Sequence, residues 1–321
     1  MNAAPWVDVL LALLLVGLGG WAVAARDGFA AIAGLVAYGL ALMLAWVRLA
    51  APDVALTEGA VGGGLSGLLL LGAWARLRGK TAEEAPPGPA LRIVVGVLCA
   101  AVTAVLAAVV LHLPEPGPTL APQAHAPLTS LGLGNPVPAV LMAYRALDTF
   151  LEVVVLFLAL AGVWSLAGDR AWGGVPGFRP AARSAALRFV ARVLPPFGVV
   201  AGIYILWNGS KVAGGEFPAA SVLAAMGLLV LVAGLARLPR VSSRRLRWAL
   251  VVGPAAFLLV GLAGMGWAGA FLGYPAGWAK PLILTIEVPL TFSLAVMLVL
   301  LIAGPPETDE QPRMNANGHE S

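Results

Sequence analysis

Four carboxylic acids lie within stretches of this sequence that are otherwise almost entirely apolar. They are Glu58, Asp148, Glu152 and Glu287. A carboxylate near the centre of a lipid bilayer costs at least about 2.5 kcal/mol, so acids there are tolerated mainly in polar interiors and along the routes of ions or protons. The chemistry expected of these four residues is therefore to line a path for a proton or a cation.

Asp148 and Glu152 are four residues apart and share one face of a helix. Repulsion between the two carboxylates and their desolvation disfavour ionisation of both. At least one carboxyl can therefore bind a proton, which suits the pair to carry protons. A structural interpretation stays open for all four acids. They would then lie near the membrane surface, partly hydrated, and pair with Arg145, three residues before Asp148, or with a neighbouring subunit.

No set of residues has the spacing of a catalytic or metal site. The three histidines, His112, His125 and His319, lie in or beside loops and lack ligand spacing. The single cysteine, Cys99, lies within an apolar run, which excludes a disulfide framework. Neither a phosphate-binding glycine loop nor a nucleophile elbow is present. We therefore expect no enzymatic activity, no cofactor and no bound metal.

The composition requires a lipid environment for most of the chain. Of 321 residues, 60% are apolar and 11% are charged, and the mean hydropathy is +0.90, far from the values of a soluble domain. The apolar runs are too long for barrel strands, so the chain is expected to be an all-α integral membrane protein. The net charge is +4, but the basic residues sit in short loops, which argues against a nucleic-acid partner.

Apolar runs of spanning length predict nine transmembrane helices. They cover residues 6–25, 29–47, 54–75, 91–113, 147–167, 188–207, 217–236, 248–272 and 281–303. With nine spans, 16 of the 20 Lys and Arg residues fall on one side of the membrane, and a miscounted span would spoil this separation. Because cytoplasmic loops carry the basic excess, the N-terminus is predicted outside and the C-terminus inside.

Other features predict how the helices pack. Gly59, Gly63 and Gly67 repeat at intervals of four, and a similar group lies at 261–269, so both spans are expected to approach their neighbours closely. Pro195 and Pro196 should kink or interrupt their span near its inner end, and a broken helix at an ion site is one interpretation. Lys211 and Glu216, in the following outer loop, are expected to be solvated or to structure that loop.

Two segments resemble the large A subunit of the multisubunit Mrp-type cation/proton antiporters, also called Mnh. Arg26-Asp27, followed by APDVALTEGAVG from Ala51 to Gly62, resembles a three-helix module near the C-terminus of that subunit. Asn135-Pro136-Val137, with YRALDTFLE from Tyr144 to Glu152, resembles its next module. The resemblance places Glu58, Asp148 and Glu152 on acidic positions of the family.

A third segment, residues 188–303, resembles the four-helix B subunit. The outer loop of that subunit reads Pro-Gly-Gly-Gly-Phe in the family, whereas the loop here reads VAGGEF from Val212 to Phe217 and lacks the Pro and the last Gly. Glu287 falls where the family usually has an acid in its last span. The family also recurs in membrane-bound hydrogenases related to respiratory complex I.

The resemblance implies four segments. They are a three-helix module (1–80), a two-helix module (81–170), a four-helix MnhB-like module (171–304) and a disordered cytoplasmic tail (305–321). It further implies a multi-pass subunit in a bacterial or archaeal plasma membrane, with other antiporter subunits, the lipid bilayer and sodium ions or protons as partners. Arg145 would tune Asp148 electrostatically.

Two other functions stay open. The chain is a scaffold that seals and joins larger subunits, or it anchors a redox enzyme such as a hydrogenase whose catalysis resides elsewhere.

Overall fold

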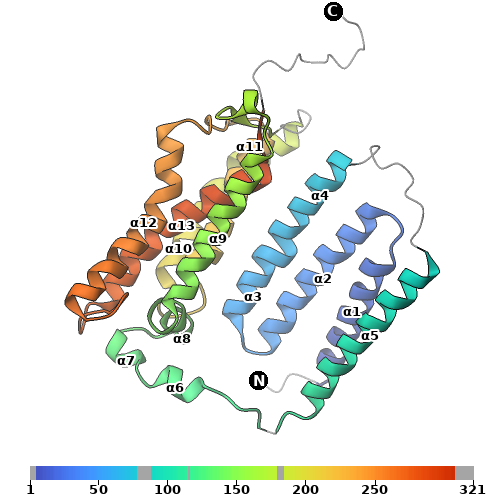
Figure 1. The fold of residues 1–321 in the computed structure, drawn as a ribbon, viewed down its shortest axis with the longest axis horizontal. Coiled ribbons are helices and arrows are strands. Elements are labelled where there is room, and N and C mark those ends of the chain that lie inside the picture. Colours follow the sequence, from blue (N-terminus) through green and yellow to red (C-terminus); the bar gives the residue numbers. More distant parts are fainter. Residues whose placement is uncertain (1–4, 78–87, 115, 179–183, 308–321) are drawn as a thin grey trace, which may run out of the picture.

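The structure, a computed structural model, describes residues 5–77, 88–114, 116–178 and 184–307. Its elements are almost all helices (Figure 1). The N-terminal part contains α1 (Pro5–Ala24), α2 (Gly28–Arg48), α3 (Pro52–Glu58), the π-helix η1 (Gly59–Leu65), α4 (Ser66–Leu77) and α5 (Pro89–Leu111). The short α6 (Ala121–His125), α7 (Leu128–Leu131), α8 (Pro136–Ala139) and the π-helix η2 (Val140–Tyr144) lead to α9 (Ala146–Ser165). The C-terminal part contains α10 (Ala185–Asn208), α11 (Glu216–Val232), α12 (Arg244–Trp267) and α13 (Ala279–Ala303).

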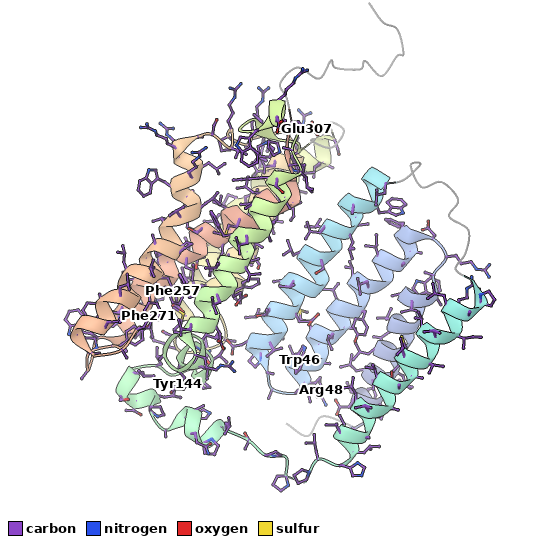
Figure 2. The ribbon with its side chains drawn as sticks, in the orientation of Figure 1. Trp46, Arg48, Tyr144, Phe257, Phe271 and Glu307 are labelled. Atoms are coloured by element: carbon purple, nitrogen blue, oxygen red, sulfur yellow. The ribbon has the colours of Figure 1, made fainter. Side chains whose placement is uncertain are left out.

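The all-α membrane fold expected from composition is confirmed. Among the described residues, eight helical segments are long and apolar enough to cross a bilayer, with α3, η1 and α4 forming one continuous segment. The seventh expected span corresponds to α11, which has 17 residues. Arg48 lies at one end of the bundle and Glu307 at the other (Figure 2). The count of nine and the orientation in the membrane remain predictions.

Helix α2 packs against α1 on one side and against α3, η1 and α4 on the other. Asp27 caps α2 by accepting a hydrogen bond from the Ala30 N–H, and Arg48 at its far end pairs with Asp8 of α1 at 2.7 Å. The contact with η1 is close because a Cβ on Gly39 would lie 2.8 Å from the Gly62 backbone. Gly63 and Gly67 face Leu40 and Val36 of α2, as the glycine spacing predicted.

Helix α5 stands apart from the other elements. Every one of its residues is exposed, and none of its side chains is buried by this chain. Figure 1 places it at the edge of the molecule, on the side of α1. The other long helix of the expected 81–170 module, α9, packs instead on α12 and α13.

Helix α13 lies at the centre of the C-terminal part, in contact with α9, α11 and α12. More than half of its residues are buried, among them Ile286, Leu290 and Met297. Phe257 of α12 is completely buried and meets Phe150 of α9 with the ring centres 5.4 Å apart. Aromatic contacts of this kind and close packing between helices take the place of the hydrophobic effect within lipid.

Pro195 and Pro196 do not interrupt their span, because α10 runs as one α-helix through both residues, and the alternative of a kink stays a prediction. Helices in membranes tolerate proline because neighbouring groups satisfy the freed carbonyls. The irregular backbone lies instead in η1 and η2, two π-helical segments placed immediately beside the expected site residues Glu58 and Arg145.

A two-stranded antiparallel sheet lies at the end of the helix bundle opposite Arg48. Strand β1 (Val175–Pro176) pairs with β2 (Pro306–Glu307), and the Gly177 N–H donates to the Pro305 carbonyl at 2.9 Å. Residues 305–307 therefore belong to the fold, which corrects the expectation of a disordered tail beginning at 305. The rest of that expected tail, 308–321, lies outside the described residues.

Candidate functional site

Glu287 is a buried acid on the most buried helix of the protein. It lies in the third turn of α13 and is 1% exposed. Among the described residues, no donor forms a hydrogen bond to either of its carboxyl oxygens. One turn later, the Thr291 hydroxyl donates to the Glu287 backbone carbonyl at 2.7 Å, so it does not satisfy the carboxyl. Of the four predicted site residues, Glu287 alone is fully buried.

Glu216 lies beside Glu287, and the expectation that it is solvated is wrong. It is the first residue of α11 and is 7% exposed, and its carboxyl lies within hydrogen-bonding reach of the Glu287 carboxyl. The chain enters α11 through Gly214 and Gly215 at φ of 154° and 118°. This positive-φ entry, which glycine accommodates, turns the residue that follows inward. Lys211, in the same loop, is exposed as expected.

Glu152 lies on α9, close enough to Glu216 for their charges to interact. Its side chain is exposed on this chain, so water, lipid or another subunit contacts it. Glu216 therefore lies near two other acids, Glu287 of α13 and Glu152 of α9. Glu58 lies on another element, at the end of α3.

Asp148 forms the ion pair with Arg145 that their spacing predicted. The Arg145 Nη2 and Asp148 Oδ2 atoms are 2.6 Å apart, and both side chains are exposed. Arg145 ends η2, and Asp148 lies in the first turn of α9, where the helix dipole favours an acid. Where η2 is followed by α9, two backbone carbonyl oxygens accept hydrogen bonds from side-chain hydroxyls. Thr149 donates to Leu141 and Tyr274 to Met142, each at 2.7 Å.

Tyr274 lies in the connection between α12 and α13, near Glu287. Burial, and to a smaller extent the nearby Glu287 carboxyl, raise the pKa of Tyr274 above its usual value near 10.0. Its hydroxyl therefore remains a donor and keeps its bond to the Met142 carbonyl. This interaction ties the loop after α12 to η2.

Glu58 ends α3 at the point where the helix changes to the π-helical η1. It is half-buried, and its carboxyl lies over Gly62, where an added Cβ would displace it. π-Helical segments in membrane and soluble helices often accompany functional residues. The site around Glu58 is therefore distinct from that around Glu287.

An apolar cavity of about 360 Å³ lies between η1 and α11. Gly59 and Ala60, which follow Glu58, line one wall, and Pro218, two residues after Glu216, lines another. The remaining lining residues come mainly from α2, α4, α11 and α13. The cavity therefore lies between the two halves of the protein, and its lining residues do not include Glu58, Glu216 or Glu287.

A polar junction at the Glu216 end of α11 joins distant parts of the sequence. Asp53 Oδ1 accepts hydrogen bonds from Asn135 Nδ2 at 3.2 Å and from the Gly214 N–H at 3.1 Å. Asn135 also donates to the carbonyl oxygens of Gly209 and Val212. The loop that leads to Glu216 is thus held by residues from both preceding segments. The sequence did not predict that Asp53 and Asn135 hold this loop, although both residues lie in the two segments that resemble the A subunit.

Two family models match separate parts of the chain. Residues 13–79 match MbhD, a family of MBH subunits, and residues 186–304 match MnhB, "Domain related to MnhB subunit of Na+/H+ antiporter". The first contains Glu58 and Asp53, and the second contains Glu216 and Glu287. The comparison with curated proteins gives no match.

Two solved structures are similar over long stretches. A chain of the Mrp complex from Dietzia sp. DQ12-45-1b matches 97% of this chain at 25% identity and a TM-score of 0.72, and this chain spans only 36% of that chain's length. A chain of the membrane-bound sulfane sulfur reductase, an archaeal respiratory membrane complex, matches 66% of this chain and 97% of its own length. That match has 24% identity and a TM-score of 0.52, and it shows a likeness of fold.

Proposed function

Because this chain is a multi-pass membrane subunit of the Mrp/MBH type, with MbhD and MnhB domains fused in one polypeptide, we propose that it works in a cation/proton antiporter. The complex exchanges sodium ions for protons across a bacterial or archaeal plasma membrane. Other subunits of the complex are the partners of this chain, and the chain itself catalyses no covalent reaction.

In this proposal Glu58, Asp148, Glu152 and Glu287 line an ion or proton path, with Arg145 as the electrostatic partner of Asp148. The observation that carries it is the burial of Glu287 without a hydrogen-bond donor, beside the buried Glu216 of α11. A purely structural acid would be paired, because an unpaired buried charge costs several kcal/mol.

The experiment compares exchange by the assembled complex with and without Glu152. The complex carrying Glu152→Gln is purified, its subunit composition is verified, and sodium-driven proton movement is measured in proteoliposomes. The proposal expects exchange to fall at least about tenfold, as for loss of a positioned proton-transfer group. Asp169→Asn, a change at an exposed residue just after α9, is the matched control. Unchanged exchange by an intact complex would remove Glu152 from the path, and altered assembly with normal exchange per complex would favour a scaffold.

The likeness to the sulfane sulfur reductase chain favours a second function, that of membrane subunit in a redox complex. Identification of the chains that copurify in mild detergent separates the two. Long antiporter-like partners without redox proteins support exchange, whereas iron–sulfur partners support the redox assignment.

A further inference from the structure

The Glu287 carboxyl lacks the hydrogen-bond donor that a buried carboxylate requires, whereas the Glu216 carboxyl accepts from its own backbone N–H. Glu287 is 1% exposed, and no described residue donates a hydrogen bond to its Oε1 or Oε2 atom. Glu216 is 7% exposed, and its carboxyl lies within hydrogen-bonding reach of that of Glu287. Two ionised carboxylates are acceptors only and cannot bond to each other. A proton on one of them would supply the missing donor.

The groups that face the pair supply no compensating positive charge. From α9, Glu152 adds a further negative charge toward Glu216. From the loop before α13, Tyr274 approaches Glu287, but its hydroxyl donates to the Met142 carbonyl. Within the described part of the chain, neither Lys nor Arg forms an ion pair with either acid. Two full negative charges there would repel each other out of contact with bulk water.

We propose that Glu216 and Glu287 form a carboxyl–carboxylate pair that binds a single proton between them. The proton forms an O–H bond to one carboxyl and a hydrogen bond to the other, so the pair carries one negative charge. This inference deepens the proposed function and rests on it, because it names the proton as the species held at this part of the path.

The surroundings favour a proton over a metal cation. Ca²⁺ and Mg²⁺ take six or more oxygen ligands, whereas the neighbours of Glu287 on α13 are the buried Ile283, Ile286 and Leu290. The Thr291 hydroxyl is already engaged with the Glu287 backbone. The described residues contain no group of three or more acidic, histidine or cysteine side chains arranged to hold a metal ion. A proton needs only the two carboxyl oxygens.

The placement of Glu216 depends on the loop before it. Glycines at 214 and 215 allow the positive φ values, and the Gly214 N–H is held by Asp53. This arrangement sets the first residue of α11 against the middle of α13. The loop of this chain thus adds a second acid where the resembling family has glycine.

Infrared spectroscopy of the full chain in lipid nanodiscs tests the proposal. The carbonyl stretch of a protonated carboxylic acid is distinct from the bands of a carboxylate. At neutral pH the unaltered chain should show one such band, which the double variant Glu216→Gln/Glu287→Gln should lack. Each single variant should shift the band, because the remaining carboxyl loses its carboxylate partner. The control Asp169→Asn should leave the band unchanged, and circular dichroism verifies that each variant is folded.

Three results would overturn the proposal. They are the same spectrum for the unaltered chain and the folded double variant, an unshifted band in Glu216→Gln, and loss of the band when sodium chloride replaces potassium chloride at constant pH. The second would assign the proton to Glu287 alone, and the third would indicate a sodium site. Because these measurements involve no transport, they can fail while Glu152→Gln still abolishes exchange, which would leave the proposed function intact.

Discussion

The carboxyl of Asp53 is hydrogen-bonded to the backbone N–H of Gly214 at 3.1 Å, across 161 positions of sequence. Asp53 belongs to the part that matches the MbhD model, and Gly214 to the part that matches the MnhB model. The two domains are therefore joined by a direct polar contact in addition to the chain between them. That contact lies immediately before Glu216.

Replacing Asp53 should loosen this junction. Asp53→Ala leaves the Gly214 N–H without its acceptor, which should cost about 1–3 kcal/mol. Asp53→Asn keeps a carbonyl oxygen in place and should cost less. The thermal unfolding midpoint in detergent, followed by tryptophan fluorescence, measures both. Equal stability of the alanine variant and the unaltered chain would show that the junction contributes nothing.

Replacing the buried acid pair with apolar residues should stabilise the protein and impair its function. Glu216→Met/Glu287→Met removes two desolvated carboxyls and keeps a similar volume, so stability should be unchanged or higher by up to about 4 kcal/mol. Exchange by the complex should fall. Unfolding in detergent and sodium-driven proton movement in proteoliposomes provide the two measurements. A less stable variant with full exchange would contradict both expectations.

Gly39 should not tolerate a side chain. A Cβ at this position would lie 2.8 Å from backbone atoms of Gly62 and Gly63, so Gly39→Ala must push α2 away from η1. We expect a loss of about 1–3 kcal/mol, and a displacement of Glu58 with η1. Gly17→Ala on α1 is the matched control, because no atom lies within 4 Å of its added Cβ. It should be neutral or stabilising by up to about 1 kcal/mol.

Tyr274 should make stability sensitive to alkaline pH. Its pKa is raised in the folded protein by burial and by Glu287, so the unfolded chain loses this proton first as pH rises. The contribution is therefore complete below about pH 10 and declines above it. Tyr274→Phe should lose this dependence and the hydrogen bond to Met142. Unfolding midpoints on both sides of pH 10, compared between the two chains, test this. Parallel pH profiles would contradict it.

Much of the fold could be predicted because lipid imposes simple rules on a sequence. Long apolar runs become helices, and the pairing of Arg145 with Asp148 follows from their local spacing. The burial of Glu216 could not be predicted in the same way. It depends on two glycines with positive φ and on the packing of α11 against α13, so a residue at the end of an apparent loop looks solvated. The bond between Asp53 and Asn135, 82 positions apart, likewise has no local signal.

The small sheet at the end opposite Arg48 also determines an order of events during synthesis. β1 precedes α10, and β2 follows α13, so the ribosome must complete all four helices of the MnhB-like part before the two strands can pair. Strand β2 can therefore pair with β1 only after α13 has been synthesised.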